Sequence, residues 1–531
     1  MGRWGGRLAA LLLGAPLALA FPEPGWWWLA LVGLAPLLVL AMAAPSGREA
    51  AVRAWLGGTG FFLAVNAFLV PTVGPFMVPL AMLLAALWLP VGWLTWALLG
   101  DPADPDPPGP GRLAAALVLV PSAFVAGEAL RSWEGLGGPW GLLGASQWNA
   151  PALLSVAALG GIWGVGFLLV AVNLAVAAAV RPGVPAPTRA AAAATAVALP
   201  LAALAFWALR PAPAPAGTAA VAFVQPGVVG PAEERFRASE RLSRTLAPAA
   251  AVDLVVWGES SIGRDPAANP GDVARLAAAA RAAGGPVLAN VDARREAVGG
   301  IYKSALLVGP SGVLGSYDKM RLVPFGEYVP LRPLLGWVTR LTDAAAVDRH
   351  RGARLAVLDA GGLAVGPLVC FESAFPDLTR NLAAAGAELV VVQTADTTFQ
   401  GSWGLDQHAS LAAVRAVESG RPVLQGALSG TSAAFDARGR RLAWAPGSWR
   451  GAAVVELPLS AERTPYVRAG DVVPVACGVA LAAAAAVAAW RRRRVSRGGS
   501  GRRTGSTPRS TPARPRRRAA GTSRTAGRPG S

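Results

Sequence analysis

Long apolar runs, each followed by a short polar turn, fill the first 210 residues of this 531-residue chain and return near its C-terminus. Seven runs of the roughly 17–25 residues that cross a bilayer precede residue 211, and an eighth follows, at about 5–21, 26–44, 54–72, 76–99, 112–131, 152–180, 188–209 and 472–490. The pattern predicts a multi-pass α-helical membrane domain over residues 1–210 with seven transmembrane helices. It also predicts an eighth transmembrane helix over residues 471–490.

Residues 211–470 have a different pattern, in which short runs rich in β-branched residues alternate with Ala-, Arg- and Glu-rich stretches. The first kind predicts strands and the second predicts helices. We expect strands at 221–224, 254–257, 305–308, 363–369 and 389–392, and helices at about 232–246, 272–283, 374–385 and 407–419. This alternation is typical of an α/β domain, whose ligands gather at the carboxyl ends of the strands.

The composition agrees with a membrane protein, since 53% of the residues are hydrophobic, 15% are charged and the mean hydropathy is +0.43. That balance lies outside the range of ordinary soluble domains. The first apolar run also fits a cleaved signal peptide, because Arg3 and Arg7 precede it and Ala18-Leu-Ala20 resembles a cleavage site. The short turn Phe21-Pro-Glu-Pro-Gly25 before the next run favours a helical hairpin instead.

Arginines in the short loops predict the orientation, because cytoplasmic loops are enriched in Arg and Lys. With a cytoplasmic N-terminus, only Arg131 falls in a short outer loop, and the inner loops hold Arg48, Arg53, Arg112, Arg181 and Arg189. Seven crossings then place residues 211–470 on the extracytoplasmic face. The eighth helix returns the chain, so both termini are expected in the cytoplasm.

The last segment, residues 491–531, contains fourteen arginines and no acidic residue, which leaves +4 of the formal net charge of +18 for the rest of the chain. Such a run suggests nucleic-acid binding. Its Ser, Thr, Gly, Pro and Arg composition without aromatic residues instead predicts a disordered cytoplasmic tail next to a membrane helix, drawn to anionic lipid. We therefore expect the lipid bilayer as a partner and no nucleic acid.

Cys370 is the candidate nucleophile, because it follows an apolar strand-like run and precedes a helix-like one. The other cysteine, Cys477, lies inside the predicted eighth helix, where a packing role is expected. A cysteine in an apolar strand is often a small core residue, which is the alternative for Cys370 as well. A helix beginning near Ser373 would favour the thiolate and lower the pKa of Cys370.

Two upstream motifs supply acid and base candidates at predicted strand ends, Glu259 in Trp257-Gly-Glu-Ser260 and Lys319 in Tyr317-Asp-Lys-Met. Burial would raise the pKa of Glu259, so that it could accept the thiol proton of Cys370. Lys319 is the candidate for stabilising an oxyanion. A Glu, Lys and Cys set of this kind performs acyl transfer through a thioester.

Three supporting residues surround this set. Glu327 lies among Pro and Phe residues, and a buried carboxylate there needs a cationic partner, so we expect it to orient Lys319. Glu372 is expected to support the nucleophile loop, and the backbone N–H of Phe371 is the candidate second oxyanion donor. The alternative for either glutamate is a solvated surface position.

Other chemistries lack residues. The chain has two histidines, His350 and His408, which disfavours a Ser-His-Asp hydrolase, and no Gly-x-Ser-x-Gly sequence is present. A zinc site would lack His and Cys ligands, and we expect no cofactor. His408 is interpreted as a cap or helix-face residue.

The motifs around Glu259, Lys319 and Cys370 resemble the Glu, Lys and Cys signatures of the carbon-nitrogen hydrolase (nitrilase) superfamily. The run Leu322-Val-Pro-Phe-Gly-Glu327 on a membrane-anchored domain is similar to the bacterial apolipoprotein N-acyltransferase family, as are Pro139-Trp-Gly-Leu-Leu-Gly-Ala-Ser-Gln147 and Thr464-Pro-Tyr-Val-Arg-Ala-Gly-Asp471. The likeness covers the chain to about residue 490, so that the tail lies outside it. It implies eight transmembrane helices and an αββα sandwich.

The resemblance also implies an activity at the bacterial cytoplasmic (inner) membrane. A phospholipid would donate an acyl chain, through a cysteine thioester, to the N-terminal α-amine of a diacylglyceryl-modified apolipoprotein, as the last step of lipoprotein maturation. The chain departs from the family pattern at Gly258, usually Pro, at Phe371, often Tyr, and at Thr398, where an Asn-Asp-x-Trp-Phe loop is usual. These positions fall in loops that would border the substrate.

Two other functions stay open at this point. One is a membrane-tethered amidase of the nitrilase type, which would release its acyl group to water. The other is a non-catalytic docking or transport protein. Coupled transport usually needs ionisable residues in the middle of the membrane helices, and Glu128 is the main one here.

Overall fold

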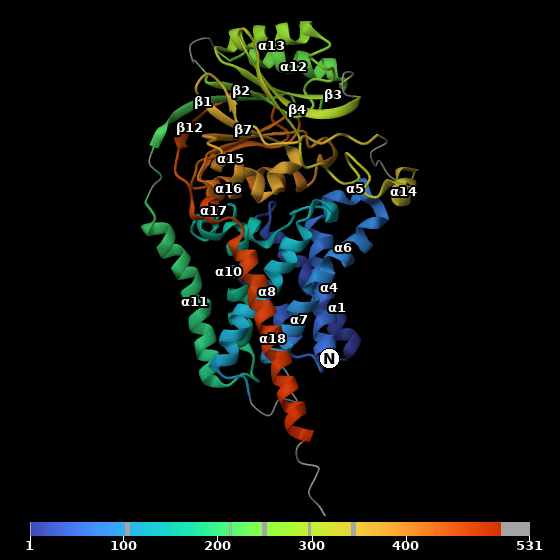
Figure 1. Cartoon of the computed structure of the whole chain (residues 1–531), viewed down its shortest axis with the longest axis vertical. Helices are drawn as coiled ribbons and strands as arrows, with labels where there is room; N and C mark the ends of the chain where they lie inside the picture. Colours follow the sequence, from blue (N-terminus) through green and yellow to red (C-terminus); the bar gives the residue numbers. More distant parts are fainter. Residues whose placement is uncertain are drawn as a thin grey trace, which may run out of the picture. The chain divides into compact units, whose positions relative to one another are not determined.

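The computed structural model describes residues 2–100, 107–211, 213, 215–246, 252–295, 299–340 and 347–500. Its N-terminal part is helical (Figure 1). The helices are α1 (Arg3–Gly14), α2 (Leu29–Val32), α3 (Ala35–Met42), α4 (Gly47–Val65), α5 (Val70–Val73), α6 (Met77–Ala85), α7 (Leu89–Leu99), α8 (Pro110–Arg131), α9 (Pro151–Leu154), α10 (Ala157–Val180) and α11 (Ala186–Leu209).

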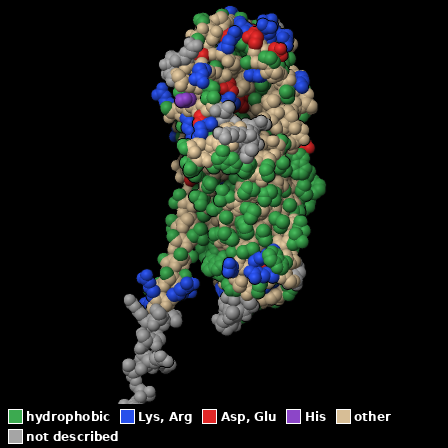
Figure 2. Space-filling model, turned by 90° about the vertical axis from the view of Figure 1, so that its right-hand side faces the viewer, with side chains coloured by type: hydrophobic (Ala, Val, Ile, Leu, Met, Phe, Trp, Pro, Cys, Tyr) green, Lys and Arg blue, Asp and Glu red, His purple; other side chains and the backbone are tan. Residues whose placement is uncertain are grey.

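Five helical stretches among the described residues are long and apolar enough to cross a membrane. They are Ala67–Leu99, Pro110–Arg131, Ala157–Val180, Ala186–Leu209 and Val472–Arg494, and Leu29–Met42 is apolar but shorter. Figure 2 shows hydrophobic side chains covering the middle of one face of the helical part, whereas charged side chains lie over the sandwich and, as Lys and Arg, at the opposite end of the helical part.

The break expected between residues 72 and 76 is present, because Gly74 has a φ of +55° and a ψ of −135°. An earlier break was not expected: α4 ends at Val65, and Asn66 leaves the helical conformation. The next stretch then runs as α5, α6 and α7 joined by short 3₁₀ turns. Pro71 and Pro75 lie in the first turns of these short elements, where a missing N–H costs nothing.

The C-terminal half contains two six-stranded sheets, in the orders β12-β1-β2-β3-β4-β5 and β11-β10-β9-β8-β7-β6. Strands β1, β2 and β3 are parallel to one another, as are β7, β8 and β9, and the outer strands are antiparallel. The bounds are β1 (Pro215–Gln225), β2 (Leu254–Trp257), β3 (Val287–Arg295), β4 (Gly300–Gly309), β5 (Gly312–Asp318), β6 (Leu358–Asp359), β7 (Ala364–Val369), β8 (Leu389–Thr394), β9 (Val423–Ala427), β10 (Ser432–Phe435), β11 (Arg441–Ala445) and β12 (Gly451–Ser460).

The two sheets pack face to face through one apolar core and carry helices on their outer faces. Helices α12 (Ala232–Ser243) and α13 (Pro270–Ala283) cover the first sheet, and α15 (Pro376–Ala384) and α16 (Gly404–Ser419) cover the second (Figure 1). The central parallel strands are buried on both faces, which explains their continuous apolar sequences. This arrangement is the predicted αββα sandwich.

The α15 and α16 layer packs against the N-terminal helices within one compact unit, Met1–Leu481. At this contact the helical conformation of α10 is interrupted at Gly161. Its φ of +66° is a backbone conformation that glycine adopts more readily than other residues. A Cβ on Gly161 would lie 2.6 Å from the ring of Tyr466 in α17 (Pro465–Ala469). Glu418 of α16 accepts a 2.6 Å hydrogen bond from the Ile162 N–H, which the break has freed.

Helix α18 (Val472–Ser500) begins in this unit and continues into a second one, Ala482–Ser531. Residues 491–500, the beginning of the segment predicted to be disordered, are therefore helical. The rest of the predicted tail, 501–531, lies outside the described residues.

Candidate active site

Three strand ends bring the predicted chemical residues to one edge of the sandwich. Glu259 follows β2, Lys319 follows β5 and Cys370 follows β7. Each position is fixed by the sheet next to it, since the Glu259 N–H bonds the Thr394 carbonyl across the two sheets at 3.1 Å and the Lys319 N–H bonds the Lys303 carbonyl at 2.9 Å. The structure thus brings together residues that are 111 positions apart in the chain.

Glu259, Glu327, Lys303 and Lys319 form a buried cluster of alternating charge. Lys319, which is fully buried, lies 2.8 Å from Glu327 and 3.5 Å from Glu259. Lys303 lies 2.6 Å from the same oxygen of Glu259 and 3.2 Å from Glu327. The second oxygen of Glu259 accepts the Ala395 N–H at 3.2 Å. Two cations therefore lie against two carboxylates in a buried site.

The expectation for the Glu259 pKa was wrong in sign. Burial does raise the pKa of Glu259, but Lys303 and, to a smaller extent, Lys319 lower it by more than burial raises it. The net shift of the pKa is therefore downward. The same neighbours, against burial, lower the pKa of Glu327 to about 2. Both groups are therefore carboxylates at neutral pH, so Glu259 is in the protonation state that a general base requires.

Lys303 is the functional candidate that sequence reasoning missed. It lies on β4, with a side chain only 12% exposed, and its Nζ donates to Glu259. A signal was present, because Lys303 and Lys319 are the only two lysines in the chain, against 47 arginines. The lysine ammonium is a compact point charge, whereas the arginine guanidinium is a planar fork. Because the chain uses arginine at its other basic positions, the two lysines mark Lys303 and Lys319 as candidate functional residues.

Cys370 adopts a conformation that is uncommon for a residue with a side chain, with φ at +52°. Strain of this kind is concentrated at functional sites. The expected helix N-terminus near Ser373 is instead a 3₁₀ turn, Cys370–Ala374, and α15 begins at Pro376. Burial, followed by the Glu259 carboxylate, raises the pKa of Cys370 well above its ordinary value, against the opposite effect of Lys319. The predicted thiolate is thus replaced by a neutral thiol whose proton must be removed.

Glu372 is buried and ties the nucleophile turn to the lysine loop. One carboxylate oxygen accepts from the Tyr317 hydroxyl at 2.7 Å and from the backbone N–H groups of Met320 and Arg321 at 2.7 and 3.0 Å. The other accepts from the Val369 N–H at 2.8 Å. These bonds give Glu372 the position expected of a residue that supports the nucleophile loop.

Phe371, the source of the candidate second oxyanion donor, is buried in the turn. Its ring packs edge-on against Phe375 at 5.0 Å. A Cβ on Gly138, in the loop after α8, would lie 2.6 Å from the Phe371 ring, so that this loop packs directly on the nucleophile turn. Glu134 of the same loop forms ion pairs with Arg321 and Arg351 of the sandwich.

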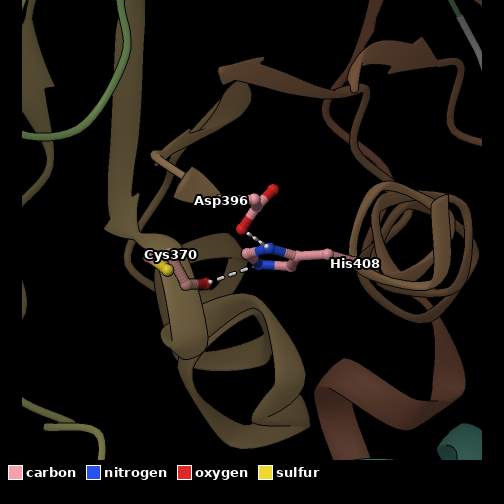
Figure 3. A group of neighbouring side chains, drawn as sticks. All are labelled: Cys370, Asp396 and His408. Atoms are coloured by element: carbon pink, nitrogen blue, oxygen red, sulfur yellow. Dashed lines mark hydrogen bonds and ion pairs between the residues drawn. The ribbon is translucent and has the colours of Figure 1, made fainter. Parts of the chain in front are cut away.

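His408 lies inside α16 and not at its end, so of the two expected positions it has the helix-face one and not the cap. Its Nδ1 is 2.8 Å from a carboxylate oxygen of Asp396. Its Nε2 is 3.2 Å from the Cys370 carbonyl oxygen and 3.1 Å from the Ser373 hydroxyl. Burial lowers the pKa of His408, but Asp396 raises it more, giving a net increase. Figure 3 shows the Cys370 carbonyl pointing toward the His408 ring and the sulfur pointing away from it.

Cys370 Sγ, one Asp396 oxygen and one His408 nitrogen lie within 4.8 Å of one another, which is close enough to consider a metal ion. Both ring nitrogens of His408 already have hydrogen-bond partners on the protein. A metal ligand needs a free nitrogen lone pair. The group therefore fits a hydrogen-bonded support of the nucleophile better than a metal centre.

An αββα sandwich with Glu, Lys and Cys at neighbouring strand ends defines a catalytic domain of the nitrilase class, here continuous with apolar helices. The family model described as Carbon-nitrogen hydrolase matches residues 219–464, and the one described as Apolipoprotein N-acyltransferase N-terminal domain matches residues 13–175.

Relatives match nearly the whole length of the chain. An apolipoprotein N-acyltransferase of Geobacter metallireducens is 32% identical over 92% of this chain and 96% of its own. An apolipoprotein N-acyltransferase of Azotobacter vinelandii is 32% identical over 88% of this chain and 92% of its own. Among solved structures, a Nesterenkonia AN1 amidase of the nitrilase superfamily is similar, with 23% identity, a TM-score of 0.35, and coverage of 47% of this chain and 93% of that one. The chain belongs to the apolipoprotein N-acyltransferase family.

Proposed function

We propose that the protein transfers an acyl chain from a phospholipid to the N-terminal α-amine of a diacylglyceryl-cysteine in an apolipoprotein, through a thioester on Cys370. The observation that carries this proposal is the placement of Glu259, Lys319 and Cys370 at three strand ends, with a membrane-type helical domain packed on the nucleophile turn. Family membership supports the same activity. Both the donor and the acceptor carry acyl chains, which suits a nucleophile turn that packs against an apolar helical domain.

In the first half-reaction, Glu259 takes the proton of the Cys370 thiol while the sulfur attacks the ester carbonyl of the phospholipid. The negative charge that develops on the carbonyl oxygen is stabilised by the Lys319 ammonium and the Phe371 N–H. The carbon–oxygen ester bond then breaks, and Glu259 returns its proton to the leaving alcohol. The products are a lysophospholipid and an acyl thioester.

In the second half-reaction, the neutral α-amine of the acceptor attacks the thioester carbonyl. Glu259 takes a proton from the nitrogen and passes it to the departing sulfur, so that an amide forms and the thiol is restored. Glu327, 2.8 Å from Lys319, holds the ammonium in place through both steps. The low exposure of the cluster disfavours water as the competing nucleophile.

We further propose the topology expected from the sequence. Residues 1–210 form a seven-helix membrane domain, 211–470 the catalytic domain on the extracytoplasmic face, and 471–490 the eighth crossing, with both termini in the cytoplasm. The five stretches long enough to span a membrane support this division. Leu29–Met42, α1 with the turn after it, and α4 would make the remaining three.

The test is a transfer assay with purified protein in detergent, a phospholipid with a labelled acyl chain and a diacylglyceryl-cysteine peptide. We expect N-acylated peptide and lysophospholipid in equal amounts. The matched control is the same peptide with an acetylated N-terminus, which should accept nothing. Free fatty acid as the main product, or hydrolysis of small amides without lipid, would favour the amidase alternative and contradict the proposal.

A further inference from the structure

His408 is hydrogen-bonded on both sides by groups that accept. The Cys370 carbonyl oxygen accepts from Nε2, and the Asp396 carboxylate accepts from Nδ1. Since a carbonyl has no proton to give, the Nε2 nitrogen must be the donor. With both nitrogens donating, the ring is an imidazolium and has no lone pair left to accept the thiol proton. His408 is therefore not a base for Cys370, despite the short distance to the sulfur.

The bond to the Cys370 carbonyl fixes the whole peptide unit between Cys370 and Phe371. In a trans peptide the N–H points opposite to the C=O. The carbonyl points toward His408 and the sulfur points away from it (Figure 3). The Phe371 N–H is consequently directed to the side on which the sulfur lies, where the oxyanion would form. The positive φ of Cys370 means that this orientation is not the relaxed one for the chain.

We propose that His408, held by Asp396, is a positioning residue that orients the Cys370–Phe371 peptide and thereby presents the Phe371 N–H to the oxyanion. This inference rests on the proposed function. His408 touches neither donor nor acceptor lipid. It acts through the carbonyl of the nucleophile residue.

Residues of the helical domain enclose this hydrogen-bond pair. The Trp140 ring packs edge-on against the His408 ring at 5.5 Å, and its Nε1 donates to Gln407 at 3.3 Å. The Arg131 guanidinium of α8 donates a 2.6 Å hydrogen bond to the Trp140 carbonyl oxygen. His408 is 1% exposed. The His408 side of this hydrogen bond is therefore closed to solvent, and its surroundings include the loop that carries Trp140.

The test compares two amides at one position. In His408→Gln the side-chain nitrogen replaces Nε2 and reaches the Cys370 carbonyl, whereas in His408→Asn it replaces Nδ1 and cannot reach it. His350→Gln, at the exposed second histidine, is the control. Two rates are measured at one pH in detergent: thioester formation from phospholipid in a single turnover, and alkylation of Cys370 by iodoacetamide, located by peptide mass spectrometry. Alkylation needs the sulfur but forms no oxyanion.

We expect His408→Asn to slow thioester formation at least tenfold, toward the roughly 100-fold cost of losing one oxyanion donor. Its alkylation rate should stay within about threefold of wild type, and His408→Gln should recover most of the thioester rate. Equal loss of both rates in His408→Asn would show a general structural role and overturn the inference. An unchanged thioester rate would overturn it as well.

A second variant and a parallel wild-type measurement complete the experiment. If His408→Asn does not fold, as judged by thermal unfolding in detergent, His408→Met removes the donor at nearly constant length and carries the same expectation. Wild-type protein is run in parallel. Absence of any thioester in the wild type would refute the proposed function, whereas a wild-type thioester that the variants match would refute only the role of His408.

Discussion

Replacing Lys303 by methionine removes one of the two cations that keep Glu259 ionised. The remaining cluster would hold two carboxylates and only the Lys319 ammonium. Lys319 is 2.8 Å from Glu327 but 3.5 Å from Glu259, so Glu259 loses more of its stabilisation. We therefore expect Glu259 to be the group that takes up a proton in Lys303→Met, so that the base for Cys370 is lost at a higher pH than in the wild type.

The size of the effect follows from the distances. At 2.6 Å and an effective dielectric constant of about 20, the Lys303 to Glu259 attraction is about 6 kcal/mol before desolvation. Removing one partner of a buried pair costs about 3–5 kcal/mol in measured cases. Because Lys319 remains, we expect the lower end, about 3 kcal/mol, which corresponds to about a 100-fold change in the equilibrium between carboxylate and carboxylic acid.

The assay is the pH dependence of thioester formation. The native pKa of Glu259 is lowered, so its base form is present above that pKa and is lost as the pH falls through it. Loss of Lys303 raises the pKa, and the acid limb of the profile should move to higher pH. At a pH below the shifted pKa the rate should fall by up to about 100-fold relative to wild type, and it should recover as the pH is raised toward neutrality. Lys303→Arg keeps the charge and should leave the limb near the wild-type position.

An acid limb that does not move in Lys303→Met would refute this reasoning. So would an equal fall of the rate at every pH, because that result indicates damage to the site and not a change in the ionisation of Glu259.

Three more results are expected. In Glu372→Gln one acceptor oxygen remains where the Tyr317 hydroxyl and the backbone N–H groups now bond to two. The free energy of unfolding should fall by about 2–4 kcal/mol, measured by denaturation. The rate of thioester formation should fall as well, measured in a single turnover. Gly258→Ala would place a Cβ 2.0 Å from the Leu428 backbone nitrogen and should cost about 1–3 kcal/mol, visible as earlier thermal unfolding. Because the pKa of Glu327 is about 2, stability that is present above pH 4.5 should be lost as the pH falls toward 2, and Glu327→Gln should flatten that dependence.

The elements of the sandwich could be predicted from the sequence because their signals are local. Buried parallel strands such as β8 are continuous apolar runs, and the helices beside them carry one apolar face. The break between α4 and α5 could not be placed, because apolar residues continue across Asn66 and only the backbone conformation there ends the helix.

The site was predictable where a residue stands at the end of a recognisable strand, as Glu259, Lys319 and Cys370 do, or follows such a residue in the same motif, as Glu327 does. Lys303 lies within β4, two strands away from β2 in the same sheet, and His408 lies within α16, so their partners become apparent only when the strand order and the helix layer are known. The pKa directions failed for the same reason. Burial of Glu259 could be expected from its sequence, but its nearest cation, Lys303, is 44 positions away in the chain.

Intact-protein mass spectrometry after incubation with phospholipid, without an acceptor, tests the central claim most directly. The account predicts that wild-type protein gains the mass of one acyl chain, that neutral hydroxylamine removes it as expected of a thioester, and that Cys370→Ala gains nothing. An adduct of the same mass on Cys370→Ala, or none on wild-type protein that has released lysophospholipid, would contradict it.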